Sequence, residues 1–347
     1  MTWTFVQKGR LPAEIVHFYE SAKGDRITSL GNRLDVRCRG ESHRIALPLS
    51  AKERLFSKLR LTRRALRLDK SNAVFNRARD GVVVIYRGNV FFFDLTAGAL
   101  TKTAELRQCR NVLHGGIAVT PHGIYFGEYG SNPVRDAVPV WRSTDDGRSW
   151  QVVYEFPAKS IRHVHGVYHD PFTDRLWLPT GDRAGECYVA SANADFSDVV
   201  THGDGTQVWR PVSMFFEADR IVWPMDSELQ TSHLQVFDRA SGRLTEHRAF
   251  PGPVWYGKRF TDGLAILQTT VEIGAGVQSD CSHLFVSENL TDWHEVAKFK
   301  KDLWPVRHFK AGVIAFADGS QASDDFVLFG EALAGLDGKS LQVALKR

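Results

Sequence analysis

The chain has 347 residues, of which 43% are apolar and 11% aromatic, and its formal net charge is +4. So small a charge argues against nucleic-acid binding, which normally requires a concentrated basic face. No apolar run reaches the length of a membrane span, and the first ten residues lack the apolar stretch of a secretion signal. We therefore expect a cytoplasmic protein with no membrane span and no nucleic-acid partner.

Short β runs separated by turns begin near residue 14. The first fifty residues contain four of them, at Glu14–Tyr19, Arg26–Ser29, Arg33–Arg37 and His43–Leu47. A helix-like insert follows at residues 51–70. It holds the one basic run of the chain, Lys52 to Lys70, for which a solvated helix or connector is favoured over a nucleic-acid face.

The remaining β runs form further units of the same kind. The approximate ranges of all the units are 14–50, 72–108, 112–156, 164–204, 212–250, 254–299 and 305–347, and the last three begin near Val212, Val254 and Val306. No linker rich in glycine, proline or serine interrupts them, so residues 1–347 are predicted to form one domain.

A polar turn recurs along these units at a constant step. The turns at Ser143 and Ser191 are 48 residues apart, and another at Ser287 lies twice that distance beyond. The intermediate places, at Leu95, Arg239 and Gly335, also fall in turns after apolar strands. A repeat of about 40 to 50 residues with several short strands per unit is typical of propeller blades. We predict an all-β fold, a single β-propeller with seven four-stranded blades; six blades plus an N-terminal closing hairpin is the alternative.

The sharpest copy of the turn is Ser143-Thr-Asp-Asp-Gly-Arg-Ser-Trp150. Ser143 and Asp145 can accept backbone N–H bonds within a tight turn, and Gly147 supplies the positive φ that such a turn requires. Trp150 begins the returning strand, where its ring can lie between two sheets. The motif resembles the Asp-box, or BNR repeat, of the sialidase-like β-propeller superfamily. That resemblance implies a structural role at the blade periphery, so Asp145 and Asp146 are not predicted to be catalytic.

The resemblance does not include the arginine motif of true sialidases. Sialidases carry an early Phe/Tyr-Arg-Ile-Pro motif for the first of three arginines, whereas the early strands here read Ile15-Val-His-Phe-Tyr and Arg26-Ile-Thr-Ser. The chain is therefore not identified as a true sialidase.

Polar residues recur at two places in the predicted blades. In a propeller, the start of each innermost strand and the end of each second strand open on the same face, where function usually resides. The innermost starts carry His114, Arg162, His163, His165, Arg210, Tyr256, Arg307 and His308, and the second-strand ends carry Glu128, Tyr129, Asp182, Asp226 and Glu272.

Several arginines near one opening suggest an anionic ligand, since the guanidinium pairs bidentately with carboxylates. Aromatic rings at Tyr129, Trp223 and Tyr256 could stack on sugars, so the predicted ligand is an acidic oligosaccharide or polysaccharide. The predicted function is cleavage of glycosidic bonds in this uronic-acid-type substrate. Its catalytic candidates are Glu128, Asp182, Asp226, His114, His165 and Tyr129, and its substrate-binding candidates are Arg162, Arg210, Arg307, His163, Tyr256, Trp223, Glu272 and His308.

Two mechanisms and one non-enzymatic function stay open. A glycoside hydrolase needs two carboxylates, for which Glu128, Asp182 and Asp226 are available. A polysaccharide lyase needs a base and a cation that stabilises the enolate; the resemblance to some propeller lyases implies a divalent metal, which His114, His165 and His308 could hold. The alternative is a non-catalytic propeller that binds a glycan or a protein.

Overall fold

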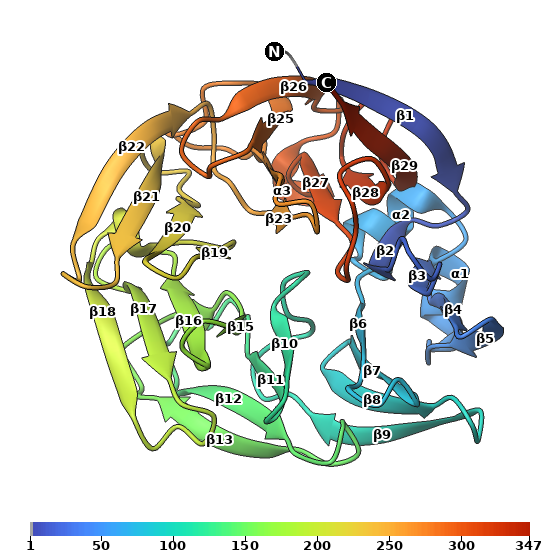
Figure 1. Ribbon diagram of the computed structural model, residues 1–347. Helices are drawn as coiled ribbons and strands as arrows, with labels where there is room; N and C mark the ends of the chain where they lie inside the picture. Colours follow the sequence, from blue (N-terminus) through green and yellow to red (C-terminus); the bar gives the residue numbers. More distant parts are fainter. Residues whose placement is uncertain (1–2) are drawn as a thin grey trace. The chain divides into compact units, whose positions relative to one another are not determined.

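The computed structural model describes residues 3–347, which form seven sheets, the blades of a β-propeller; six have four strands, and in the remaining sheet the innermost of four strands is divided in two (Figure 1). The predicted fold class is thereby confirmed. The six-bladed alternative is wrong, because residues 15–46 form a complete sheet of four strands rather than a closing hairpin. The chain divides into two compact units. One comprises the described part of Met1–Lys70 with Val222–Val236 and Leu244–Arg347, and the other comprises Ser71–Ile221 with Phe237–Arg243.

Three complete sheets belong to the first unit. They are β2 (Ile15–Tyr19), β3 (Arg26–Leu30), β4 (Arg33–Cys38) and β5 (Glu41–Ala46); β23 (Gly257–Arg259), β24 (Ala265–Gln268), β25 (Cys281–Ser287) and β26 (His294–Lys300); and β27 (Val313–Phe316), β28 (Phe326–Glu331), β29 (Lys339–Lys346) and β1 (Thr4–Leu11). The last sheet takes its outer strand from the opposite end of the chain. β1 runs antiparallel to β29, from the pair Thr4 and Lys346 to the pair Leu11 and Ser340 (Figure 1).

Three further sheets belong to the second unit. They are β6 (Asn72–Phe75), β7 (Gly81–Tyr86), β8 (Asn89–Asp94) and β9 (Ala99–Glu105); β10 (Ile117–Thr120), β11 (Gly123–Gly127), β12 (Val138–Ser143) and β13 (Gln151–Phe156); and β14 (His163–Val164) with β15 (Tyr168–Asp170), β16 (Arg175–Gly181), β17 (Cys187–Ala192) and β18 (Val199–Gly205). In the third of these sheets, β14 and β15 both pair with β16, so the innermost strand is interrupted between them.

The seventh sheet contains residues of both units. It comprises β19 (Phe215–Phe216), β20 (Arg220–Pro224), β21 (Ser232–Asp238) and β22 (Leu244–Phe250), and a short 3-10 helix, η1 (Gln207–Trp209), precedes it.

Burial along the strands explains why these segments pair. β7 and β11 are buried at every residue, as expected of inner strands covered on both faces, whereas β4 alternates buried and more exposed positions. Between the sheets of β7 and β11, the side chains of Ile85, Phe92, Phe126 and Trp141 share one apolar core. Face-to-face packing of twisted sheets thus provides the hydrophobic stabilisation of each unit.

The turn between β12 and β13 has the hydrogen bonds expected of the Ser143–Trp150 motif. Asp145 accepts bonds from the Ser143 hydroxyl at 2.8 Å and from the Ser149 amide at 2.8 Å, while Ser143 Oγ accepts the Gly147 amide at 2.8 Å. Gly147 has a φ of +96°. The Trp150 ring packs 5.0 Å from that of Phe126, so the motif fastens a hairpin to the core.

Three short helices belong to the first unit: α1 (Ala51–Phe56), α2 (Arg60–Ala65) and α3 (Val306–Phe309). Ser50 begins α1 with a capping box, in which its hydroxyl and amide exchange bonds with Glu53. The prediction that a strand begins near Val306 is wrong, because this segment is α3 and β27 begins at Val313. Within residues 3–347, no helix is both long and apolar enough to span a membrane.

Candidate functional site

The predicted site residues divide between the two units. Eight lie in the second unit: His114, Glu128, Tyr129, Arg162, His163, His165, Asp182 and Arg210. Six lie in the first unit: Trp223, Asp226, Tyr256, Glu272, Arg307 and His308. Members of the first set form a polar cluster centred on Asp182.

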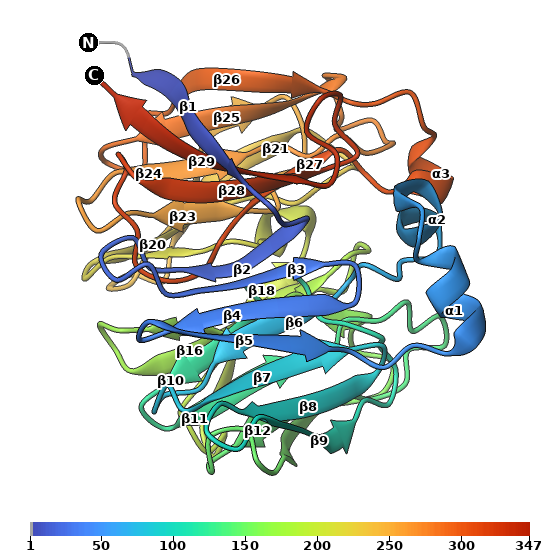
Figure 2. The ribbon, with the colours of Figure 1, turned by 90° about the vertical axis from the view of Figure 1, so that its right-hand side faces the viewer.

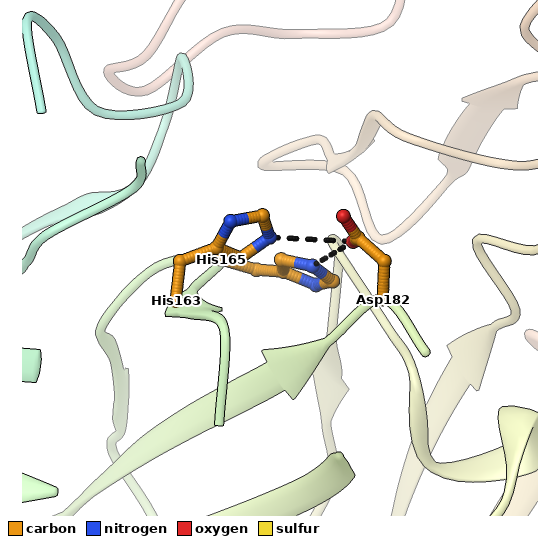
Figure 3. Close-up of side chains that lie close together, drawn as sticks. All are labelled: His163, His165 and Asp182. Carbon is orange, nitrogen blue, oxygen red and sulfur yellow. Dashed lines mark hydrogen bonds and ion pairs between the residues drawn. The ribbon is translucent and has the colours of Figure 1, made fainter. Parts of the chain in front are cut away.

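Strand pairing brings the members of this cluster together. His163 and His165 are two residues apart, so their side chains leave β14 and its extension on the same side. β14 pairs with the end of β16, where His163 lies opposite Gly181, and Asp182 follows directly. Both imidazoles point toward the one carboxylate (Figure 3). A Cβ at Gly181 would lie 3.2 Å from Arg210 and 3.3 Å from His165, so glycine permits their close approach.

Four cationic or potentially cationic side chains contact Asp182. His163 Nε2 and His165 Nε2 lie 3.2 and 3.1 Å from Oδ1. Arg210 Nη2 lies 3.1 Å from Oδ1, and Arg162 Nη1 lies 2.5 Å from Oδ2. Gln207 completes the group by donating to the Asp182 carbonyl oxygen at 2.9 Å. We call Arg162, His163, His165, Asp182, Gln207 and Arg210 the Asp182 cluster.

The cluster is largely buried, with Arg162 as its most exposed member. His163, His165 and Arg210 are nearly inaccessible, whereas 28% of the Arg162 side chain is exposed. Tyr129 lies beside the cluster, its ring centroid 4.1 Å from that of His163. Arg162 donates from Nε to the Ser131 carbonyl at 3.1 Å and from Nη1 to Asp182. Within the described residues its Nη2 has no hydrogen-bond partner, so this nitrogen is available to a ligand.

The protons of the two imidazoles follow from their other contacts. His163 Nδ1 lies 2.7 Å from the Gly130 carbonyl oxygen, and His165 Nδ1 lies 2.8 Å from that of Pro211. Because a carbonyl oxygen only accepts, each Nδ1 must carry a proton. In the neutral rings both Nε2 lone pairs then face the carboxylate. Attraction at this point requires either a second proton on each ring or a cation among the three groups.

The acid–base properties of the cluster argue against proton transfer by Asp182. Burial raises the pKa of Asp182, but its contacts with the His163 and His165 imidazoles and the charge of Arg210 outweigh burial and hold this pKa well below its ordinary value. Burial lowers the pKa of His163, an effect that the hydrogen bond to Asp182 only partly offsets. Asp182 is therefore a permanent anion at neutral pH, suited to holding cationic groups rather than to donating a proton.

Three residues of the cluster could hold a metal ion. One ligand atom from each of His163, His165 and Asp182 lies within 4.8 Å of the others. The bonds from Nδ1 to carbonyl oxygens are the outer-shell contacts that orient histidine ligands in metal sites. This set replaces the predicted trio of His114, His165 and His308, because His308 is an exposed residue of α3. The two arginines on Asp182 would oppose a cation electrostatically.

The other predicted residues of the second unit lie outside the cluster. Glu128 is buried. Its carboxylate accepts hydrogen bonds from the backbone amides of Arg107 at 2.8 Å and Gln108 at 2.6 Å. It also accepts a hydrogen bond from the Trp141 indole N–H at 3.0 Å. Those bonds hold a loop against a strand end, which is a structural role. His114 is half-buried in the loop before β10.

The structure corrects several placements in the first unit. Trp223 is fully buried in β20 and cannot offer a ring to a sugar. Asp226 is buried and accepts the Trp255 indole N–H at 2.8 Å. Arg307 and His308 are exposed on α3 rather than at the start of an innermost strand. Tyr256 is half-buried against the apolar core, and Glu272 is half-buried in the loop after β24.

Sequence reasoning missed Gln207 and the carbonyl oxygens of Gly130 and Pro211. Gln207 lies three residues before Arg210, and its Oε1 accepts a hydrogen bond from Arg210 Nη1 at 3.2 Å. This spacing could have identified Gln207 if a helical turn had been expected at η1. The carbonyl oxygens could not have been identified, because every residue has one and the residue type does not show which will lie at a site.

Comparisons with known proteins identify the fold. No protein family model matches the chain, and no curated protein matches it. Solved structures do: the extracellular domain of a putative hybrid two component system from B. thetaiotaomicron is similar over 99% of this chain, with a TM-score of 0.60 and 8% identity. The chain spans only 40% of that protein.

Two structures of YCF48 match along nearly their full length. YCF48 from Cyanidioschyzon merolae is 11% identical, with a TM-score of 0.56 over 99% of each chain. YCF48 bound to D1 peptide is 14% identical, with a TM-score of 0.54 over 99% of this chain and 95% of the other. At such low identity these similarities show the seven-bladed propeller fold alone.

Proposed function

We propose that this chain is a non-catalytic β-propeller that binds a protein ligand through an anionic group received at the Asp182 cluster. The observation that carries the proposal is the charge of this cluster: two guanidinium groups converge on one carboxylate, beside two imidazoles. A carboxylate from a ligand would offset the surplus positive charge. Arg162 is the residue suited to receive it, because its Nη2 is unpaired and its side chain is partly exposed.

Cleavage of glycosidic bonds is less well supported by the same residues. A hydrolase requires two carboxylates that flank the bond, one of them able to donate a proton. Asp182 has a strongly lowered pKa, and Glu128 is occupied by three N–H donors. Among the predicted site residues of the second unit, Asp182 and Glu128 therefore do not form the pair of proton donor and free carboxylate that a hydrolase requires.

The preference for a protein ligand over a glycan comes from the similar structures. One of them, YCF48, is a complex with a peptide. A shared fold does not fix function. A peptide is therefore only the first ligand class to test.

A peptide array tests this proposal. Each peptide is displayed in an acidic form and in a matched form with Asp and Glu replaced by Asn and Gln, and binding of the purified protein is measured. We expect binding to the acidic forms only, weakened about tenfold or more by Arg162→Gln, since a charge-assisted hydrogen bond contributes roughly 1.5–3 kcal/mol. Arg175→Gln is the matched control, because Arg175 pairs with Asp198 at the opposite end of β16.

Three outcomes would count against the proposal. One is equal binding to acidic and neutral peptides, and another is equal weakening by Arg175→Gln. The third is release of reducing ends or unsaturated products from a polyuronate, with the release abolished in Asp182→Asn, which would restore the enzymatic interpretation.

A divalent cation is a second candidate ligand of the same cluster. The specific observation in its favour is the orientation of the two imidazoles, whose Nε2 lone pairs face Asp182 once Nδ1 is protonated. His163, His165 and Asp182 would hold the ion. Bound there, it would supply additional positive charge for an anionic ligand.

A further inference from the structure

The helical insert between β5 and β6 exposes an unusual amount of apolar surface. Seven of the fourteen large apolar side chains exposed among residues 3–347 lie in or beside the helices of the first unit: Leu55, Phe56, Leu59, Leu61, Leu66, Leu303 and Trp304. Leu303 is fully exposed and Leu59 is 67% exposed. None of the six residues of α1 is buried, so this helix packs little of its surface against the sheets. A cluster of exposed apolar side chains is typical of a surface that a partner molecule or a membrane covers.

The helices hold these side chains close together. α2 and α3 are in contact, and Figure 2 shows α1, α2 and α3 one above another beside the sheets of their unit. The Arg64 guanidinium lies 5.8 Å from the Phe309 ring, and the Phe309 ring lies 5.0 Å from that of Trp304. The exposed residues of α1 and α2 and the segment Leu303–His308 therefore form one surface, which we call the insert face.

The basic run of the insert has two sets of charges with different surroundings. The inward set is paired with one acid of the insert itself and with acids in the loops between strands: Arg60 with Asp69 and Asp337, Arg63 with Glu14, and Arg64 with Asp302. Lys310 joins the same network through Asp69 and Glu331. These buried or half-buried pairs fasten the insert to its unit, because an unpaired charge there would be costly.

The outward set has no such partners. Lys52, Arg54, Lys58, Arg67 and Arg307 are exposed, and none of them forms an ion pair or a side-chain hydrogen bond with the part of the chain that is described. Each of them lies within three residues in sequence of an exposed apolar residue of the insert face. A solvated connector would explain the charges, but it would not explain seven exposed apolar side chains among them.

We propose that the insert face docks on a membrane surface rich in anionic lipids. Leucine, phenylalanine and tryptophan side chains flanked by lysine and arginine are the composition of interfacial elements that lie in the headgroup region. The unpaired cations are complementary to anionic headgroups, and the inward ion pairs keep the face rigid while it docks. The surface lies entirely within the first unit, so this inference is independent of the Asp182 cluster.

Vesicle co-sedimentation tests this inference with the full chain. We expect binding to phosphatidylcholine vesicles that contain phosphatidylglycerol, and little binding to vesicles of phosphatidylcholine alone. Lys58→Glu and Arg67→Glu should each weaken partitioning at least about fivefold, since each basic residue near an anionic surface contributes about that factor. The double variant Leu303→Ser/Trp304→Ser should weaken it about tenfold through lost apolar burial. High salt should reduce binding of the unmodified protein.

Two matched variants serve as controls. Ile273→Ser removes an apolar side chain that is 69% exposed in the same unit, and Lys298→Glu reverses an exposed charge on β26. Neither should change binding to vesicles. All substituted residues are exposed, so circular dichroism should show unchanged folding.

Equal binding to both vesicle types, no binding to either, or losses as large in the controls would overturn the proposal. It would also be overturned by self-association that Leu303→Ser/Trp304→Ser abolishes in the absence of vesicles, because the insert face would then be an interface between copies of this chain.

Discussion

Trp141 donates its indole N–H to Glu128 at 3.0 Å, in the interior of the second unit. The same carboxylate accepts two consecutive backbone amides. Glu128→Gln should therefore lower the free energy of unfolding by about 2–4 kcal/mol, because a side-chain amide cannot accept all three bonds. Denaturant titration measures this loss. Glu155→Gln, at an exposed position, should change stability by less than about 0.5 kcal/mol. A stable Glu128→Gln protein with a lost activity would instead reveal a chemical role for this residue.

Gly147 allows the turn after β12 to approach β7. A Cβ at this position would lie 2.3 Å from Cγ2 of Val83, in addition to the unfavourable φ of +96°. We expect Gly147→Ala to destabilise the protein by at least about 2 kcal/mol. Gly98→Ala is the control, because Gly98 has a φ of +65° with open space around it, and about 1 kcal/mol should be lost there. Equal losses in thermal unfolding would show that backbone strain alone, not the contact with Val83, determines the effect.

Lys258 should make stability depend on alkaline pH. Burial lowers its pKa from 10.5 to about 8, although the charge of Asp318 opposes the shift. Between these two values the unfolded chain retains a proton that the folded protein has released, so the free energy of unfolding should rise with pH through this window. The full rise is about 3 kcal/mol. The neutral amine can still donate to the carbonyl oxygens of Ala317 and Gly319.

The measurement for Lys258 is a difference between two proteins. Unfolding is followed from about pH 7 to pH 11 for the unmodified chain and for Lys258→Met, which cannot titrate. The stability of the unmodified protein should rise relative to that of the variant as pH increases. A constant difference would contradict a lowered pKa.

Isothermal titration with Zn²⁺ tests whether His163, His165 and Asp182 hold a metal ion. We expect one equivalent to bind near neutral pH and binding to disappear in His165→Ala. His247→Ala, at an exposed histidine of the first unit, should bind as the unmodified protein does. If no ion binds, the Asp182 cluster is not a zinc site.

The fold could be predicted because its signals are local. The spacing of polar turns and the runs of apolar residues reflect strands that are covered on both faces, as in β7 and β11. β1 carried no such signal, since it is an outer strand with no buried residue. Its pairing with β29 joins residues at opposite ends of the sequence. The segment at Val306 was mistaken for a strand because four residues are too few to distinguish helical from strand periodicity.

The candidate site was predictable where strand alternation determines it. Two residues on one side of β14 and the residue after β16 must meet, and the sequence contains them as His163, His165 and Asp182. Burial was the missing information elsewhere. The Trp223 ring and the Asp226 carboxylate have the chemistry of a binding site, but the former lies in a core and the latter is bonded to Trp255. Only the packed structure distinguishes such residues from those that a ligand can reach.

The pairing of β1 with β29 sets an order of events during synthesis. β1 emerges from the ribosome more than 300 residues before its partner β29, so the sheet of β27, β28 and β29 cannot be completed until β29 has been made. Until then β1 has unpaired amides and carbonyls, which can pair with a neighbouring chain. A protein that lost residues 4–11 would leave β29 as an open edge permanently. The principal defect of this shortened protein would then be aggregation rather than loss of a binding site.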